Sequence, residues 1–242
     1  KKDVKKYPER VILGSETFVR DVYTFYEFAK KHNALIGDFV WAGIDYLGEV
    51  GLGAMEYKNY AKDFTGGLGW LTAGSGRLDI TGRELGEALY TKVAYELLPI
   101  AIAVVPADNA SKPRSPSAWG MTNARASWSW NGCDGNATSV EVYARAYKVR
   151  LLVNGKKVGE RKIKNDCKAI FKTKYYGGTI EAVGMSKDGQ EICRTALSTA
   201  GDETVLRIEP ENESPKKGGL LFVRLRYTDD SGTTKPLARG EI

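Results

Sequence analysis

The sequence predicts a multi-domain chain in which a parallel β/α segment is followed by an antiparallel β-sandwich. Two observations lead to this expectation. Residues 10–53 read as strand, helix and strand, an order that makes the two strands parallel because the helix carries the chain back to the start of the sheet. After residue 121, valines alternate with polar residues in short runs separated by Asn-Gly and Asp-Gly turns, as in all-β sandwiches.

Each of the two expected parallel strands ends at a residue of chemical interest. The apolar run at residues 11–15 leads to Glu16, and the run at residues 36–40 leads to Trp41. In a (β/α) barrel, the C-terminal ends of the strands form the active site. A carboxylate beside an indole suits sugar cleavage there, because the carboxylate can attack an anomeric carbon and the indole offers a flat apolar face to the ring.

Two helices are expected in the first part of the chain. Residues 18–31 place apolar side chains at helical spacing, so that one face would pack on the strands. A second helix should begin near Thr81, because the order Thr-Gly-Arg-Glu at residues 81–84 fits a capping box. Its own apolar residues recur at helical spacing, which predicts a second buried face.

Residues 42–80 are expected to form a glycine-rich loop with several aromatic side chains. Long loops that follow barrel strands commonly build the substrate pocket. The candidate sugar contacts in this loop are Asp45, Tyr46, Glu49 and Trp70. An alternative interpretation is that the aromatic side chains only pin the long loop to the barrel.

The second half of the chain is expected to be a linker and two β regions. Residues 106–120 contain several prolines, which resist helices and central strands, and should connect the domains. Residues 121–212 should form the sandwich, with the clearest hairpin turn at Asn154-Gly155, of type I′, and a similar turn at Asp188-Gly189. Residues 213–242 are expected to start a further β module.

Four segments resemble glycoside hydrolase family 2, the β-galactosidase and β-glucuronidase group. GSETF at residues 14–18 and GDFVWAGIDYLGE at residues 37–49 resemble the end of the family's catalytic barrel, and residues 74–85 resemble the loop before its last helix. Residues 127–159 resemble the domain that follows the barrel. The resemblance implies C-terminal strands and helices of a (β/α)8 TIM barrel in residues 1–105, followed by an immunoglobulin-like antiparallel β-sandwich.

The resemblance also implies roles for individual residues. Glu16 matches the catalytic nucleophile and Trp41 matches the tryptophan that lies against the bound sugar, while Asp45 and Tyr46 are expected to bind substrate as well. The family's acid/base glutamate follows an asparagine on an earlier barrel strand. The Asn-Glu pair at residues 212–213 stands in a polar run that does not fit this context. We therefore expect the acid/base upstream, and this chain to be a C-terminal piece of a longer retaining β-glycosidase.

Three hypotheses on function follow. The first is a β-galactosidase fragment, and the second is a β-glucuronidase. Glucuronidases of the family share an Asn-x-Lys-Gly motif that grips the sugar carboxylate; here Asn59 and Lys62 are one residue too far apart and lack the glycine. The third is a non-catalytic β-sandwich module for carbohydrate binding or domain assembly, since two strands alone cannot close a barrel.

Composition argues against other classes of partner. The net charge is +6, from 36 basic and 30 acidic side chains, but the basic residues are dispersed along strands that would face water. We therefore expect no nucleic acid partner. No apolar stretch is long enough to span a bilayer, so no membrane partner is expected either. The expected partner is a carbohydrate substrate, and a homo-oligomer stays open.

Cofactors and metals are not expected. The cysteines, Cys133, Cys167 and Cys193, lack the spacing of metal ligands, and no other ligand cluster is visible. We expect them to be free thiols in a reducing compartment, which predicts a cytoplasmic protein, although one disulfide between sandwich strands is the alternative.

Overall fold

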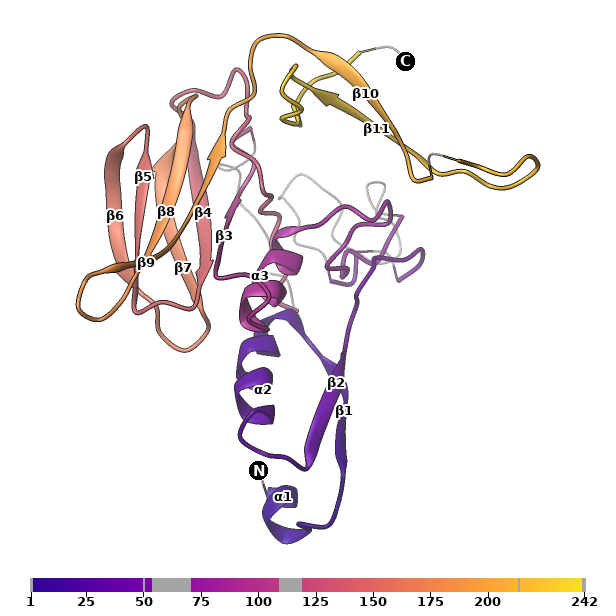
Figure 1. The fold of residues 1–242 in the computed structure, drawn as a ribbon, viewed down its shortest axis with the longest axis vertical. Helices are drawn as coiled ribbons and strands as arrows, with labels where there is room; N and C mark the ends of the chain where they lie inside the picture. The colour runs from indigo at the N-terminus through magenta and orange to yellow at the C-terminus, as the bar shows by residue number, and fades with distance from the viewer. Residues whose placement is uncertain (1, 50, 54–70, 109–118, 213, 241–242) are drawn as a thin grey trace.

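The computed structural model describes residues 2–49, 51–53, 71–108, 119–212 and 214–240. Two sheets of three and four strands form a β-sandwich, and two smaller two-stranded sheets lie outside it. Figure 1 shows an α/β segment that extends away from the sandwich towards the N-terminus, and a long hairpin that projects near the C-terminus.

The N-terminal segment contains the predicted strand–helix–strand unit. Its elements are α1 (Lys2–Lys6), β1 (Ile12–Thr17), the 3-10 turn η1 (Val19–Asp21), α2 (Val22–Ala29) and β2 (Leu35–Val40). β1 and β2 pair in parallel, which confirms the expected order and direction of the strands. The helix is shorter than predicted because its first turn is of the 3-10 type.

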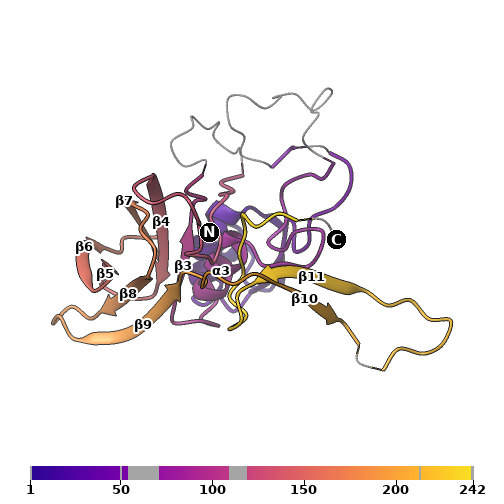
Figure 2. The same cartoon turned by 90° about the horizontal axis from the view of Figure 1, so that it is seen from above.

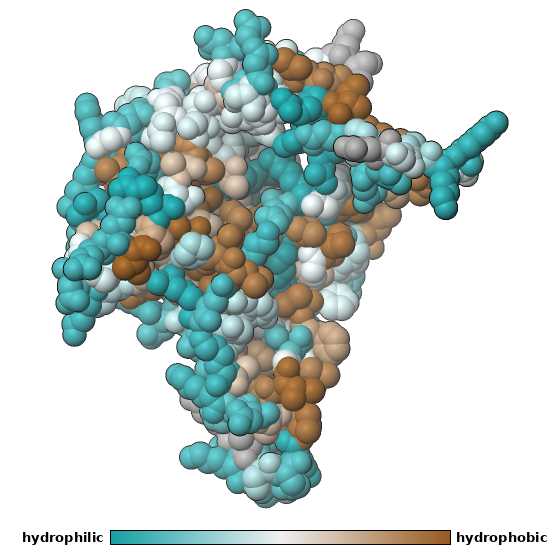
Figure 3. All heavy atoms as spheres, in the orientation of Figure 1, coloured by the Kyte–Doolittle hydropathy of each residue, from teal (hydrophilic) through white to brown (hydrophobic). Residues whose placement is uncertain are grey.

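The two parallel strands expose much of their apolar surface. Leu13 is 51% exposed, Ile36 66% and Phe39 62%, and Figure 3 shows apolar side chains gathered over this part of the chain. Within the described residues, no third strand pairs with β1 or β2. Apolar runs of this kind are typical of strands that are covered on both faces.

The helix predicted to begin near Thr81 begins later, as α3 (Gly86–Ala94). The Asp79 carboxylate accepts hydrogen bonds from the Thr81 backbone N–H at 2.9 Å, from the Thr81 hydroxyl at 2.6 Å and from the Arg83 N–H at 3.0 Å. These bonds hold residues 79–83 in a turn. The predicted capping box is therefore wrong, and Leu85 takes the N-cap position without a side-chain cap.

The sandwich predicted from strand periodicity is confirmed. Its three-stranded sheet has the order β3–β4–β7, and its four-stranded sheet has the order β6–β5–β8–β9. The strands are β3 (Ile100–Val104), β4 (Ala137–Ala144), β5 (Lys148–Val153), β6 (Lys156–Lys162), β7 (Lys168–Lys174), β8 (Thr179–Met185) and β9 (Glu191–Ser198). All pairs within the two sheets are antiparallel.

β3 corrects one expectation about where the sandwich begins. Its residues fall within the segment 1–105 that was expected to belong to the barrel, yet β3 pairs with β4 along its whole length, from Ile100 opposite Ala144 to Val104 opposite Val140. The sandwich therefore includes a strand that precedes the proline-rich linker. Part of that linker, residues 109–118, lies outside the described residues.

Two apolar cores explain why β3 is apolar at every position. One core lies between the two sheets and includes Ile102, Trp128 and Leu151. The other lies between the outer face of the three-stranded sheet and the helices, and includes Val22 of α2 and Val93 of α3. A strand that is covered on both faces reads as a continuous apolar run, because neither face meets water.

The two predicted hairpin turns differ from each other. Between β5 and β6, Asn154 and Gly155 both have positive φ, 50° and 73°, which confirms the type I′ turn. Between β8 and β9, only Gly189 has a positive φ, 83°. The Ser186 N–H donates to the Gln190 carbonyl at 2.8 Å, so this connection is a wider loop and not a second type I′ turn.

The C-terminal region forms a hairpin of its own. β10 (Val205–Pro210) and β11 (Val223–Thr228) pair with each other and with neither sheet of the sandwich, and Figure 2 shows them projecting from it. β10 lies within the segment 121–212 that was expected to be sandwich. The Lys235 ammonium fastens this region, since it donates to the carbonyls of residues 201, 202 and 203 at 2.8–2.9 Å.

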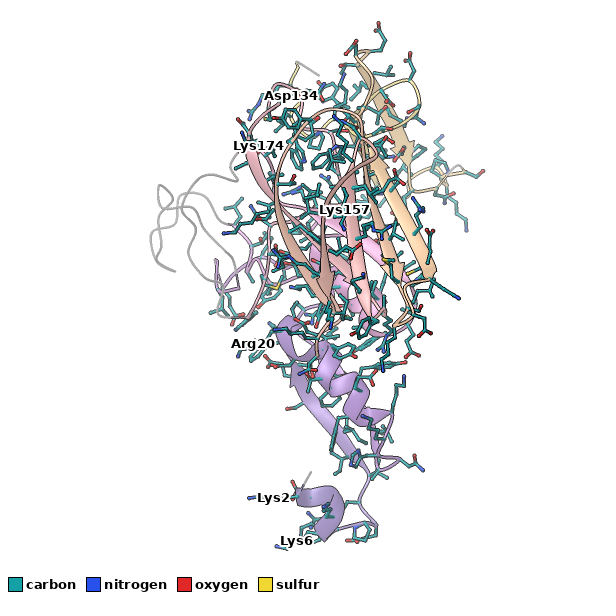
Figure 4. All side chains as sticks on the ribbon, turned by 90° about the vertical axis from the view of Figure 1, so that its left-hand side faces the viewer. Lys2, Lys6, Arg20, Asp134, Lys157 and Lys174 are labelled. Carbon is teal, nitrogen blue, oxygen red and sulfur yellow. The ribbon has the colours of Figure 1, made fainter. Side chains whose placement is uncertain are left out.

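Three expectations from composition can be compared with the structure. Cys133, Cys167 and Cys193 are free thiols, as expected. No helix among the described residues is long and apolar enough to cross a membrane. Basic side chains are spread over the sandwich surface, where Lys157 and Lys174 lie well apart (Figure 4).

Candidate active site

Glu16 and Trp41 lie beside each other at the C-terminal ends of two paired strands. In the register of β1 and β2, Thr17 is opposite Val40, and the Trp41 backbone N–H donates to the Thr17 carbonyl at 3.4 Å. Glu16 directly precedes Thr17 on β1, and Trp41 directly follows Val40, the last residue of β2. The structure therefore brings the two main predicted site residues together at one edge of the sheet.

The Glu16 side chain points away from the buried side of its strand. Thr17 is 4% exposed, whereas Glu16 is exposed, because successive side chains of a strand face opposite sides. Within the described residues, the Glu16 carboxylate makes no hydrogen bond or ion pair. Both of its oxygens are thus available to a molecule that approaches the strand end.

Trp41 and Tyr46 form an aromatic corner. Their ring centroids are 5.7 Å apart and the rings are inclined at 75°. The Trp41 indole N–H donates to the Tyr46 hydroxyl at 3.2 Å, and that hydroxyl in turn donates to the Glu49 carboxylate. Trp41 keeps 42% of its surface exposed, so the corner offers an open apolar face whose orientation is fixed by hydrogen bonds.

The environment of Tyr46 favours the neutral phenol. Partial burial raises the pKa of Tyr46, and the hydrogen bond to the Glu49 carboxylate raises it further because the phenol donates its proton to that bond. Tyr46 therefore stays protonated at neutral pH and acts as a donor to Glu49. The chain from indole to hydroxyl to carboxylate holds the corner in one arrangement.

Asp45 is turned towards the loop and not towards the aromatic corner. Its two carboxylate oxygens accept hydrogen bonds from the backbone N–H groups of Gly74 and Ser75, each at 3.2 Å. Gly76 approaches the Asp45 backbone so closely that a Cβ there would lie 2.3 Å from the Asp45 nitrogen. Asp45 thus fastens residues 74–76 to the end of β2, and its contact with substrate stays a prediction.

Arg77 is a site residue that sequence reasoning did not single out. It is 4% exposed, and its guanidinium donates to the Thr17 carbonyl and to the Ala42 carbonyl, each at 3.4 Å. Burial lowers the pKa of Arg77 from its ordinary value. In the sequence, Arg77 could have been noticed as a lone arginine among small and apolar residues, in the segment Gly74-Ser-Gly-Arg-Leu.

Trp70 and a possible metal site remain to be described. Trp70 lies outside the described residues. In the described part of the chain, no group of three or more histidine, cysteine, aspartate or glutamate side chains is placed to hold a metal ion. The geometry at the strand ends is that of a free carboxylate next to an aromatic platform.

A family model matches the middle of the sandwich. The match covers residues 135–193 and carries the description "Domain of unknown function (DUF4982)". These residues include strands β4 to β8 and the start of β9. This match concerns the sandwich alone and says nothing of the strand ends that carry Glu16 and Trp41.

Sequence and structure comparisons reach beyond the sandwich. A "Putative beta-glucuronidase" of Formosa agariphila is 28% identical over 174 residues, which are 71% of this chain and 14% of that protein. A crystal structure of a glycosyl hydrolase family 2 member from Bacteroides cellulosilyticus matches with a TM-score of 0.80 and 25% identity, over 98% of this chain and 31% of that one.

A second solved structure, of a glycosyl hydrolase family 2 member from Bacteroides cellulosilyticus DSM 14838, has a TM-score of 0.73 and 24% identity over 98% of this chain. This chain spans less than a third of the length of each of these three proteins. The match nonetheless runs through both the α/β segment and the sandwich. This chain is therefore similar in sequence and fold to members of glycoside hydrolase family 2, the family that the motifs around Glu16 and Trp41 resemble.

Proposed function

We propose that the protein to which this chain belongs is a retaining β-glycosidase in which Glu16 is the nucleophile. The observation that carries the proposal is the position of an exposed carboxylate, unpaired among the described residues, at the end of β1 and next to Trp41 at the end of β2. The relationship to glycoside hydrolase family 2 supports the same assignment.

The proposal includes an architecture for the N-terminal segment. β1 and β2 are interpreted as the last two strands of a (β/α)8 barrel, with the immunoglobulin-like sandwich after them. Exposed apolar residues on these strands, such as Ile36 and Phe39, would then be covered by the other strands and helices of the barrel. Covering them removes apolar surface from water, which contributes roughly 25 cal/mol for each Å².

The proposed reaction has two steps at the anomeric carbon. In the first, a Glu16 oxygen attacks that carbon, the bond to the leaving oxygen breaks, and a covalent glycosyl-enzyme forms while a second carboxyl group protonates the leaving oxygen. In the second, the same group takes a proton from water, and the water oxygen displaces Glu16. The configuration of the sugar is therefore retained after two inversions.

The second carboxyl group is proposed to come from outside the described residues. In retaining enzymes the two carboxyl groups are about 5 Å apart. The nearest alternatives in sequence are already engaged, since Asp45 accepts two backbone hydrogen bonds and Glu49 accepts one from Tyr46. Neither carboxylate is oriented to donate a proton to a leaving group without breaking these bonds.

Trp41 is proposed to carry the sugar ring. The apolar face of a pyranose packs on an exposed indole, and the bond from the indole N–H to Tyr46 fixes the plane of that indole. A fixed platform reduces the freedom of the bound sugar. The anomeric carbon therefore spends more time within reach of the Glu16 carboxylate.

Two substrates remain as candidates, a terminal β-galactoside and a terminal β-glucuronide. β-Galactosidase was the first expectation from sequence, because the glucuronidase motif Asn-x-Lys-Gly is absent. The name of the Formosa agariphila relative favours the glucuronide. Hydrolysis of 4-nitrophenyl β-galactoside and β-glucuronide by the full-length protein decides between them.

Replacement of the proposed nucleophile tests the assignment. Glu16→Gln in the full-length protein should lower kcat by about a thousandfold or more, since it removes the attacking group. Asp21→Asn is the matched control, an exposed carboxylate five residues along the chain, and should leave kcat unchanged.

A second experiment identifies the nucleophile by product. In Glu16→Gly, added azide should attack the anomeric carbon of an activated aryl β-glycoside, displace the phenolate and yield the α-glycosyl azide. Hydrolysis by Glu16→Gln at the wild-type rate, with no azide product from Glu16→Gly, would overturn the assignment of Glu16.

A further inference from the structure

Several buried polar atoms around Arg77 lack hydrogen-bond partners. Within the described residues these atoms are Asp38 Oδ2, Ser75 Oγ, Arg77 Nε and Glu87 Oε2. Asp38, Glu87 and Tyr95 are the groups whose charges interact with the Arg77 guanidinium. Because unpaired buried polar groups cost free energy, a cluster of them next to a candidate active site calls for an explanation beyond packing.

Arg77 is connected to both strand ends through their backbones. Its Nη2 donates to the carbonyl of Thr17, the residue after Glu16, and its Nη1 donates to the carbonyl of Ala42, the residue after Trp41. Its own backbone N–H donates to the same Ala42 carbonyl at 2.9 Å. One side chain thus links the two residues that directly follow the proposed nucleophile and the proposed sugar platform.

The geometry requires an arginine. A guanidinium presents its N–H groups in a rigid planar fork, so that two acceptors on different strands can be held at a set separation. A lysine ammonium is a single point of charge on a flexible stem and cannot fix two carbonyls in this way. The cost of burying the cation is offset in part by the nearby carboxylate of Asp38.

We propose that Arg77 is a positioning residue that sets the placement of Glu16 relative to Trp41 by holding the carbonyls of Thr17 and Ala42. This inference rests on the proposed function of Glu16 and Trp41. Arg77 touches neither the sugar nor the reacting carboxylate, and acts through the backbone of the two strand ends.

The expected effect of losing Arg77 is a loss of rate without a loss of active sites. Displacement of a nucleophile by about 1 Å can slow a reaction by about a hundredfold. Arg77→Met removes the fork and keeps an unbranched side chain, and should slow attack by Glu16 by about ten- to a hundredfold. Arg77→Lys keeps the charge but not the fork, and should fall between Arg77→Met and the wild type.

The experiment measures covalent trapping of the full-length protein. A 2,4-dinitrophenyl 2-deoxy-2-fluoro-β-glycoside of the galacto or glucurono series transfers its sugar to Glu16 and releases dinitrophenolate. Because this leaving group needs no protonation, the trapping rate depends on the nucleophile and not on the acid/base. The amount of dinitrophenolate released gives the fraction of active protein. The rate constant of its release reports how well Glu16 is placed for attack.

Arg145→Met is the matched control. Arg145 also donates to two backbone carbonyls, those of Val93 and Ala94, but it lies on the sandwich side of the helices. A general loss of stability should lower the trapped fraction in both variants. A slower rate constant with the full trapped fraction, in Arg77→Met and not in Arg145→Met, is the expected result.

Hydrogen–deuterium exchange gives a readout that does not depend on activity. The amides of Trp41 and Ala42, which donate to the Thr17 and Ser75 carbonyls, should exchange at least tenfold faster in Arg77→Met and unchanged in Arg145→Met. If neither galacto nor glucurono reagent labels the wild type, the proposed function fails, and exchange alone decides whether Arg77 holds the strand ends.

Two results would overturn the role of Arg77. One is a trapping rate constant in Arg77→Met equal to that of the wild type. The other is unchanged exchange at Trp41 and Ala42. If Arg77→Met does not fold, Arg77→Lys provides the same comparison, because it retains the positive charge near the Asp38 carboxylate.

Discussion

Arg145 of the sandwich forms an ion pair with Glu27 of α2, with 2.8 Å between Arg145 Nη1 and Glu27 Oε1. The same guanidinium donates to the Val93 carbonyl near the end of α3 at 3.1 Å and also to the Ala94 carbonyl. One side chain from the residue after β4 therefore joins the sandwich to both helices. The orientation of β1 and β2 relative to the sandwich depends on these helices.

Loss of this junction should destabilise the protein. The Arg145 side chain is 22% exposed and Glu27 26%, so Arg145→Met removes the shorter of the two ion pairs of a partly buried carboxylate, and one donor from each of two helix-end carbonyls. We expect the free energy of unfolding to fall by about 2 kcal/mol. Urea unfolding of the full-length protein measures this change.

Arg194→Met is the control for that measurement. Arg194 forms ion pairs with Glu181 and Glu191 on the sandwich surface, and its side chain is 47% exposed. Exposed pairs contribute less than about 1 kcal/mol because water and salt screen them. Equal losses of unfolding free energy in Arg145→Met and Arg194→Met would show that the Arg145 junction stabilises the protein no more than an exposed ion pair does.

The buried carboxyl of Glu87 should make stability depend on pH. Glu87 is 1% exposed, and burial raises its pKa to about 7. Thr122 donates its backbone N–H to Glu87, while from the sandwich the charge of Glu141 raises the pKa of Glu87 and the charge of Lys168 lowers it. The Arg77 guanidinium and the Tyr143 phenol also interact with Glu87.

The direction of the dependence follows from the raised pKa. Between about pH 7 and the ordinary glutamate value, the folded protein holds a proton that the unfolded chain releases. Stability from this group is therefore fully present below the unfolded pKa, and is lost as the pH rises through about 7. A shift from 4.5 to about 7 corresponds to about 3 kcal/mol.

Glu87→Gln should remove this dependence. The amide oxygen can still accept the Thr122 N–H, and no proton is exchanged. The difference in unfolding free energy between Glu87→Gln and the wild type should therefore change by about 3 kcal/mol between pH 4.5 and pH 8, in favour of the variant at high pH. A difference for Glu87→Gln that stays constant across this pH range would contradict the prediction.

Local patterns in the sequence predicted the helices, strands and turns better than they predicted which strands pair with each other. The strand–helix–strand unit and the turn at Asn154 could be predicted because hydrophobic period and turn residues act over a few positions. The apolar run of β3 was assigned to the barrel part of the chain, because a pattern typical of a strand covered on both faces does not say which sheet the strand joins. Pairing with β4, more than thirty residues later, placed it in the sandwich.

The candidate site shows the same limit. Glu16 and Trp41 could be proposed because each ends an apolar run, and their proximity follows from parallel pairing. Arg77 could not, because its role depends on two carbonyls from strands that are distant in sequence. The late start of α3 also depended on one side chain, since the Asp79 carboxylate binds the N–H groups of Thr81 and Arg83 and holds residues 79–83 in a turn.

The aromatic corner provides a final prediction about substrate binding. Tyr46→Phe keeps the ring next to Trp41 but removes the hydroxyl that accepts the indole N–H and donates to Glu49. The indole then loses its fixed plane, so the KM of the full-length enzyme should rise about three- to tenfold, as expected for about 1 kcal/mol of lost hydrogen bonding, while kcat changes less. Tyr147→Phe, at an exposed tyrosine of the sandwich, should alter neither value. A kcat loss in Tyr46→Phe as large as that in Glu16→Gln would instead place the Tyr46 hydroxyl in the chemical step, because a residue that only orients the platform cannot be as necessary as the nucleophile.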